Sequence, residues 1–305
     1  MQRTLIVSVL ACLTQLAPIP ETRASERARI NPRTGLFEPP LADLRKAAER
    51  GDRAELARAA GRVAPARLAK ALAEPDRRLV LAVLEAIPLV APGITLLEQV
   101  LPLIGAADQA MRERAVGTTA TLLGTSDAND LAEYEIPTAV VRAACQALAS
   151  TAANERESVT TRLLAVQGQA EAAAACAGSF NPAVLLASPV PDIRRAAVLT
   201  LPAGPAANDR LLDAARDSDG RVAAAAGARL CSRKVRLPPG LPPLGRLALA
   251  QGAAPEDVID ILPCLVAAKA PADQEALAKL RQVGPAAIRD AIKNLMPPAA
   301  KSAPP

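Results

Sequence analysis

Apolar side chains recur along this chain in a stripe that is typical of short helices buried on one face. In its clearest copy, positions i, i+3, i+4 and i+8 are held by Ile193, Ala196, Ala197 and Leu201. Residues at this spacing lie on one side of a helix. Related stripes begin at further anchor residues, namely Leu79, Met111, Val141, Val222, Val258 and Ile288. The pattern therefore predicts a series of short helices that pack against one another.

The spacing of the anchor residues predicts how these helices are arranged. Successive anchors from Leu79 to Ile288 are separated by 32, 30, 52, 29, 36 and 30 residues. A helix pair that recurs about every 30 residues is typical of an α-solenoid, in which each pair buries its apolar face against its neighbours. The 52-residue interval contains an additional predicted helix over residues 155–177, so we interpret residues 155–188 as an irregular insertion. The solenoid is expected to span residues 41–296.

Turn-forming residues separate this helical region from its surroundings. Residues 25–40 are rich in turn signals and poor in apolar side chains, which favours an extended linker. Two short helices split at Gly51 are expected over residues 41–61, where they would cap the array. Residues 232–244 are interpreted as a Pro-rich linker between repeats, and residues 297–305 as a disordered Pro/Ala tail.

The N-terminal residues 1–24 have the pattern of an export signal. Arg3 provides a positive charge, residues 5–17 are mostly apolar but too few to span a membrane, and small residues precede a cleavage point after Ala24. The residues that end at Cys12 also resemble a bacterial lipobox, which would place a lipid on that cysteine. A buried N-terminal helix is the third alternative.

The composition favours helices over sheets. The chain is 50% hydrophobic but only 1% aromatic and contains no Trp, so Ala and Leu must supply most of the packing. Ala has the highest helix propensity, and small side chains let helices approach closely. With 28 Pro in 305 residues the helices must be short, because Pro is tolerated in a first turn and breaks a helix interior. We therefore expect an all-α fold.

Charge and histidine content narrow the function classes. The 36 basic and 31 acidic residues give a net charge of +5, but they are interspersed, whereas nucleic-acid-binding proteins usually concentrate basic and aromatic side chains on one face. We therefore expect no nucleic acid partner. The absence of His removes the commonest general base and the nucleophile arrangements that depend on it. We accordingly expect no catalysis, no metal and no cofactor.

Two segments resemble the second helix of HEAT repeats, particularly the short repeats of the phycobilisome-lyase group. They are Ser-Pro-Val-Pro-Asp-Ile-Arg-Arg-Ala-Ala at 188–197 and Val-Arg-Ala-Ala-Cys-Gln-Ala-Leu at 141–148, and the resemblance extends over residues 65–295. It implies a right-handed solenoid of stacked helix pairs. Some proteins of this fold are bilin lyases, so the resemblance also raises a small-molecule or enzyme-accessory function.

Arginine follows four of the anchor residues, and these arginines are the candidate binding residues. They are Arg112, Arg142, Arg194 and Arg289. In a stack they would lie along one edge of the second helices. The resemblance implies that they donate hydrogen bonds to neighbouring turns, and the alternative is a site for an acidic partner. The equivalent positions hold Val80, Ala223 and Ile259, so any arginine ladder is expected to be interrupted.

Acidic residues and cysteines provide the remaining candidates. Residues 126–135 lack the central Gly and terminal Glu of an EF-hand loop, so a solvated turn is expected there, and residues 217–220 are expected to cap a helix. Cys231 and Cys264 are expected on neighbouring second helices, where a disulfide is geometrically reasonable. Cys145 is interpreted as a small buried apolar residue. No Cys-x-x-Cys pair is present, which argues against a metal site.

Together these features predict an exported, non-catalytic scaffold in a bacterial envelope, either periplasmic or secreted. We expect it to present a row of second helices to a protein or an extended peptide. One alternative is an enzyme accessory or bilin-lyase-like binder of a small molecule. Another is a structural lipoprotein of the outer membrane anchored at Cys12, which is the one interpretation that implies contact with a membrane.

Overall fold

The structure is a computed structural model that describes residues 40–268 and 270–296. These residues form helices and contain no β-strand, which confirms the prediction of an all-α fold. The expected signal peptide, Cys12, the linker up to residue 39 and the tail over residues 297–305 lie outside the described residues.

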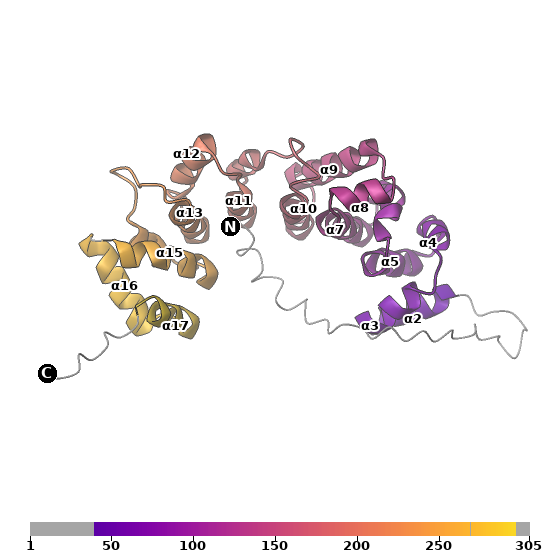
Figure 1. Cartoon of the computed structure of the whole chain (residues 1–305), viewed down its shortest axis with the longest axis horizontal. Coiled ribbons are helices and arrows are strands. Elements are labelled where there is room, and N and C mark those ends of the chain that lie inside the picture. Colours follow the sequence, from indigo (N-terminus) through magenta and orange to yellow (C-terminus); the bar gives the residue numbers. More distant parts are fainter. Residues whose placement is uncertain (1–39, 269, 297–305) are drawn as a thin grey trace, which may run out of the picture. The chain divides into compact units, whose positions relative to one another are not determined.

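Short helices follow one another with brief connections (Figure 1). As far as the middle of the chain they are α2 (Pro40–Arg50), α3 (Arg53–Ala60), α4 (Pro65–Leu72), α5 (Arg77–Ala86), α6 (Leu97–Val100), α7 (Gln109–Thr125), α8 (Ala128–Glu133), α9 (Thr138–Ala153) and α10 (Val159–Glu171). They continue as α11 (Pro191–Thr200), α12 (Pro205–Ala214), α13 (Gly220–Ser232), α14 (Leu244–Ala248), α15 (Pro255–Ala267), α16 (Pro271–Val283) and α17 (Ala286–Leu295). The 3-10 helices are η1 (Ile87–Leu89), η2 (Gly93–Leu96), η3 (Leu101–Gly105) and η4 (Pro182–Ala187).

Capping residues explain where the helices begin. The Asp76 carboxylate accepts the backbone N–H of Arg78 at 3.0 Å and starts α5, and the Asp108 carboxylate accepts the backbone N–H of Met111 at 2.9 Å and starts α7. Each cap satisfies an N–H group that the first helical turn leaves without a partner. Five other helices place Pro in their first turn, namely α4, α11, α12, α15 and α16. The many prolines therefore start helices, as the composition predicts.

Eight helices pack in succession, each against the next, and we call them the helix row. They are α2, α5, α7, α10, α11, α13, α15 and α17 (Figure 1). A second set of elements lies beside the row, each packed on a row helix: α4 on α5, α9 on α10, η4 on α11, α12 on α13, and α16 on α17. From α10 onward, helices that are neighbours in the row are separated in sequence by one element, whereas two or more elements separate the neighbours before α10.

The order of the row corrects the interpretation of residues 155–188 as an insertion. α10 lies between α7 and α11, whereas α9, which carries Val141, packs beside α10. In the row helix α10 the anchor residue is Thr161, which is fully buried and lies 32 residues before Ile193. The 52-residue interval resulted from counting a flanking helix as a row helix.

Two local predictions also differ from the structure, and the segment between α5 and α7 has no long helix. Residues 93–105 are divided among η2, α6 and η3, where Pro92 and Pro102 prevent a continuous α-helix. The helix expected over residues 155–177 ends at Glu171. The turn expected over residues 126–135 contains α8.

Small side chains let the row helices approach closely. A Cβ atom added to Gly168 on α10 would collide with Ala120 on α7, so these two helices meet almost at backbone level. In α13, nine residues including seven consecutive ones from Val222 to Ala228 are buried. Leucines such as Leu123 and Leu148 fill the wider spaces. The core is thus built from Ala and Leu, as the scarcity of aromatic residues requires.

Candidate functional site

Three of the four candidate arginines bind the turn that precedes their own helix. The Arg112 Nη1 donates to the carbonyl oxygens of Ala106 and Ala107, at 2.8 Å each. The Arg194 Nη1 donates to the carbonyl oxygen of Ser188 at 2.9 Å, and the Arg289 Nη1 to that of Gly284 at 2.9 Å. The acceptors at Ser188 and Gly284 belong to buried residues, that at Ala106 to a half-buried residue and that at Ala107 to an exposed one. The arginines thus provide donors for carbonyl groups outside the helices. The hydrogen bonds to turns that the HEAT resemblance implies are therefore present at these three positions.

Two of these arginines also reach the turn before the next helix of the row. The Arg112 Nε lies 3.2 Å from Glu157, and the Arg194 guanidinium donates two hydrogen bonds of 2.8 Å to the Asp217 carboxylate. Such forked pairs fix geometry as well as charge. We call this series of contacts, from the start of one row helix to the turn before the next, the arginine ladder.

The ladder is continuous across the position where an interruption was expected. Val80 carries no charge, but Arg77 lies one helical turn earlier on the same face of α5 and donates to Asp108 at 2.6 Å. The Arg45 Nη1 on α2 likewise donates to Asp76 at 3.0 Å. Residues three apart on a helix share a face, so Arg77 takes the role expected of position 80.

Arg162 is a ladder residue that the sequence analysis missed. It is only 3% exposed, its Nε donates to the carbonyl oxygen of Ala152 at 3.0 Å, and its Nη2 donates to the Ser188 hydroxyl at 3.4 Å. It follows Thr161, and the polar character of that residue concealed the anchor position. The repeat distance of 32 residues to Ile193 is the signal that identifies it.

Arg142 lies apart from this edge, contrary to expectation. It is exposed on α9, and among the described residues no hydrogen bond or ion pair involves its side chain. Because α9 is a flanking helix, the residue after its anchor faces a different surface from that of Arg112 and Arg194.

The ladder ends at α13, where a different charge arrangement begins. Ala223 replaces the arginine, and Arg221 donates to Asp192 at 2.6 Å and to Asp219 at 3.1 Å. Arg195 on α11 reaches past α13 to α15, where it donates to Asp257 at 2.8 Å. Charges of α11, α13 and α15 therefore neutralise one another directly.

The pKa shifts follow from these pairs. Hydrogen bonds from Arg194 hold the pKa of Asp217 below its usual value, and those from Arg77 do the same for Asp108. Burial raises the pKa of Asp257 in spite of Arg195, and burial together with the charge of Asp257 raises that of Asp260. The two α15 carboxyls are thus in a drier environment than the ladder carboxylates.

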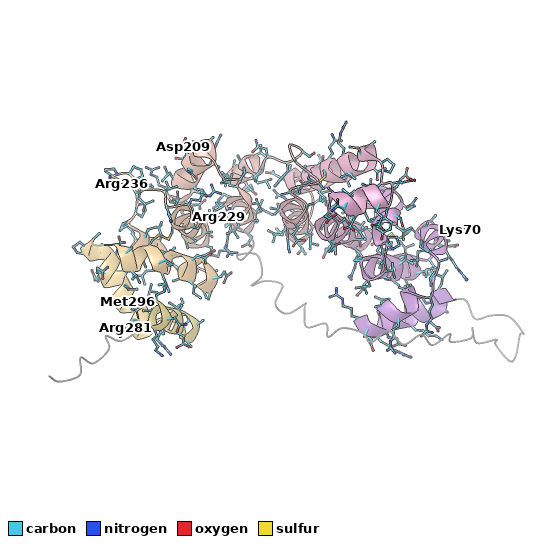
Figure 2. All side chains as sticks on the ribbon, viewed as in Figure 1. Lys70, Asp209, Arg229, Arg236, Arg281 and Met296 are labelled. Atoms are coloured by element: carbon cyan, nitrogen blue, oxygen red, sulfur yellow. A yellow bond between two sulfur atoms is a disulfide. The ribbon has the colours of Figure 1, made fainter. Side chains whose placement is uncertain are left out.

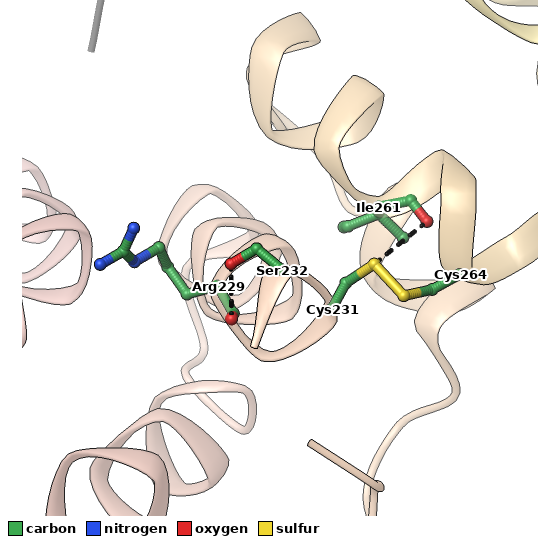
Figure 3. The surroundings of a disulfide bond; sticks show 5 residues. All are labelled: Arg229, Cys231, Ser232, Ile261 and Cys264. Carbon is green, nitrogen blue, oxygen red and sulfur yellow. Dashed lines mark hydrogen bonds between the residues drawn. A yellow bond between two sulfur atoms is a disulfide. The ribbon is translucent and has the colours of Figure 1, made fainter. Parts of the chain in front are cut away.

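Two disulfides join neighbouring elements. Cys231 on α13 is bonded to Cys264 on α15, with sulfur atoms 2.02 Å apart (Figure 3). Cys145 on α9 is bonded to Cys176 after α10, with sulfur atoms 2.00 Å apart. Cys145 is completely buried, as expected of a small apolar residue, but that interpretation missed its bond. The sequence separations of 33 and 31 residues match one repeat, and that regularity was available in the sequence.

An open cleft lies beside the end of the ladder. It has a volume of about 1080 Å³ and is bounded by the turn before α13, the Pro-rich linker, α14 and α16. Its cations are Arg216, Arg221, Arg246 and Lys279, and its carboxylates are Asp217, Asp219 and Glu275. Arg194 and Arg221 neutralise the two aspartates, whereas no ion pair between described residues involves Arg246 or Lys279. The cleft therefore carries excess positive charge.

Tight packing holds the walls of this cleft together. The backbone N–H of Gly245 on α14 donates to the buried Asp273 carboxylate on α16 at 2.7 Å, and a Cβ atom on Gly245 would crowd Ala276. The linker that carries Arg236 forms another wall through Gly240, Pro242 and Pro243 (Figure 2). A second, largely apolar cavity of about 480 Å³ lies near Pro92.

The acidic segments considered for calcium serve as helix caps. Asp127 and Asp130 form a reciprocal capping box at the start of α8, and Asp219 accepts the backbone N–H of Arg221 at the start of α13. Within the described ranges no three His, Cys, Asp or Glu residues are grouped as a metal site would require. None of the described helices is both long and apolar enough to span a membrane.

No family model matches the chain. A search of curated proteins finds no significant match.

Proposed function

We propose that this protein is a HEAT-like α-solenoid that acts as a non-catalytic scaffold and holds an extended, acidic peptide segment of a partner protein in the cleft between α13, α14 and α16. The carrying observation is the excess of positive charge in that cleft, where Arg246 and Lys279 have no carboxylate partner among the described residues. Its volume of about 1080 Å³ slightly exceeds that of pockets for small molecules and suits several residues of extended chain. Exposed cations at a binding surface also speed encounter with acidic partners.

Preorganisation supports this proposal. The arginine ladder and the Cys231–Cys264 disulfide tie the neighbouring helices together, and the Gly245–Asp273 contact ties α14 to α16. Because this surface is already fixed, the scaffold would lose little conformational entropy when a partner docks on it. The solenoid interpretation is supported by the successive packing of the helix row and by the flanking elements that alternate with it.

We also propose that the chain is exported, to the periplasm or the medium. All four cysteines of the described residues are paired in disulfides, and such bonds persist in oxidising compartments. The signal-like pattern of residues 1–24 agrees with this. Mass spectrometry of the protein from its native host tests it: a mature N-terminus at Ser25 supports export, a lipid on Cys12 supports the lipoprotein alternative, and an intact Met1 with free thiols contradicts both.

Affinity capture from the native host, with mass spectrometry of the captured proteins, tests the cleft. The test variant is Arg246→Glu with Lys279→Glu, and the matched control is Arg281→Glu, an exposed charge on α16 that does not line the cleft (Figure 2). We expect the same partner with wild type and control, and its loss with the double variant while circular dichroism stays helical. Capture that the double variant retains, or that is lost equally in the control, would overturn the proposal.

A further inference from the structure

Two arginines at the C-terminal end of α13 direct their guanidinium groups to a single backbone oxygen. The Arg229 Nη2 donates to the carbonyl oxygen of Leu201 at 3.3 Å, and the Arg233 Nη2 donates to the same oxygen at 2.6 Å. The Arg233 Nη1 also donates to the Asn208 side chain at 3.1 Å. Residues four apart are neighbours on a helix face, so two positive charges lie side by side.

This pair lacks the carboxylate partners that other arginines of the same region have. Arg194, Arg195 and Arg221 each bind at least one carboxylate, whereas no ion pair between described residues involves Arg229 or Arg233. Each guanidinium has five N–H donors, and the three hydrogen bonds to Leu201 and Asn208 occupy few of them. The Arg229 Nε is buried and has no acceptor.

The surroundings make this arrangement costly unless an anion is present. Burial lowers the pKa of both guanidiniums, and the charge of Arg229 lowers that of Arg233 further. Asp260 on α15 attracts Arg229 without a hydrogen bond to it. A half-buried charge that lacks a partner is unfavourable, and an oxyanion placed between the two forks would supply the missing acceptors.

The C-terminus of α11 compensates only part of the positive charge of Arg229 and Arg233. Leu201 follows the C-terminus of α11, where a cation interacts favourably with the helix dipole, but that dipole end is equivalent to about half a negative charge. The two positive charges of the guanidiniums exceed this half charge. Asp260 supplies one more negative charge nearby, so the remaining excess is about half a positive charge, which a monoanion compensates better than a phosphate dianion.

We propose that Arg229 and Arg233 form a binding site for a carboxylate group, supplied either by a peptide or by a small organic acid. Arg229 lies in the last turn of α13 and Arg233 is the residue that caps this helix. Arg229 points away from the Cys231–Cys264 disulfide that ties α13 to α15 (Figure 3). Neither arginine lines the cleft of the proposed function. The two proposals therefore depend on different residues and can fail separately.

Nuclear magnetic resonance of the mature chain labelled with ¹⁵N-arginine tests the site. The Nε–Hε signals of Arg229 and Arg233 are followed while sodium acetate replaces sodium chloride at constant ionic strength. We expect both signals to shift along one saturable curve and the exposed Arg281 signal to stay in place. The absence of a saturable shift, or an equal shift for Arg281, would overturn the proposal, because it would show only general screening of charge.

Conservative variants test the geometry of the fork. Arg229→Lys and Arg233→Lys keep the charge but remove the paired N–H donors, and we expect each to weaken acetate binding about tenfold. Arg281→Lys, at an exposed arginine outside both proposed sites, should leave it unchanged. Lysine variants that bind as well as wild type would contradict a forked site, and their folding is checked by circular dichroism.

A pair of short peptides identifies the source of the carboxylate. One peptide ends in a free carboxylate and the other in an amide. Tighter binding of the free acid than of acetate assigns the site to a peptide terminus, and equal binding of free acid and acetate assigns it to a small acid. Equal binding of both peptides at these arginines would contradict recognition of the carboxylate.

Discussion

The contact between Arg194 and Asp217 provides the sharpest test of the arginine ladder. Its side chains are only 15% and 13% exposed, and two hydrogen bonds of 2.8 Å join them. Removing one partner of a buried pair costs about 3–5 kcal/mol, because it leaves the other charge unpaired. Since both side chains keep some contact with water, we expect Arg194→Met to lower the free energy of unfolding by about 3 kcal/mol.

The exposed pair between Arg221 and Asp192 is the matched control. Its side chains are 39% and 46% exposed, and pairs of that kind contribute about 1 kcal/mol or less. Urea unfolding followed by circular dichroism compares Arg194→Met with Asp192→Asn. A loss for Arg194→Met no larger than for Asp192→Asn would refute the argument that the ladder stabilises the packing of neighbouring row helices.

The pH dependence of the same pair supplies an independent check. Arg194 lowers the pKa of Asp217 in the folded state, so its stabilising contribution is present above the unfolded pKa of about 3.9 and is lost as the pH falls through the folded pKa. In Arg194→Met the burial of Asp217 acts to raise that pKa. We therefore expect the stability difference between wild type and variant to shrink as the pH is lowered below about 4.

Two further predictions concern the disulfides and the contact between α7 and α10. For loops closed over 31 and 33 residues, chain entropy predicts a loss of about 3.7 kcal/mol when either disulfide is removed by Cys→Ala pairs; urea unfolding of the two double variants should show similar losses. Gly168→Ala should destabilise by about 1–2 kcal/mol through overpacking against Ala120, whereas Gly117→Ala, which meets no neighbour, should stabilise slightly; thermal unfolding compares them.

The sequence predicted the helical class and many helix ends because those features are local. Asp108 and Asp219 cap helices through contacts within three residues, and prolines in first turns can be recognised without any tertiary information. The capping box of Asp127 and Asp130 was equally local, so α8 was predictable from residues for which we expected a solvated turn.

The assignment of helices to the row was less predictable, because flanking and row helices share one pattern. α9 buries Val141, Ala144 and Leu148 at the same spacing as a row helix. α10 places Thr161, Arg162 and Gln169 in buried positions, and such polar residues hide a row helix from a search for apolar stripes. Contacts across repeats decide the assignment, and these are not visible in a single helix.

The partner of each arginine could not be predicted for a similar reason. Position after the anchor identified Arg112, Arg194 and Arg289, but the carboxylates that Arg112 and Arg194 bind lie 45 and 23 residues further along the chain. Arg77 serves the ladder from a position three residues earlier than expected. Arg229 and Arg233 follow no anchor, so the spacing rule gave no reason to consider them.

The distribution of arginine partners explains why both proposed sites lie in the same part of the chain. As far as Asp217 the ladder arginines are bound to turns of the protein itself, and a side chain occupied in this way contributes little to an external partner. Beyond the ladder, the Cys231–Cys264 disulfide and the Arg195–Asp257 pair hold neighbouring helices together. Several arginines of that region therefore make no ladder contact, among them Arg229, Arg233 and Arg246. The cations of both proposed sites lie in this part of the chain.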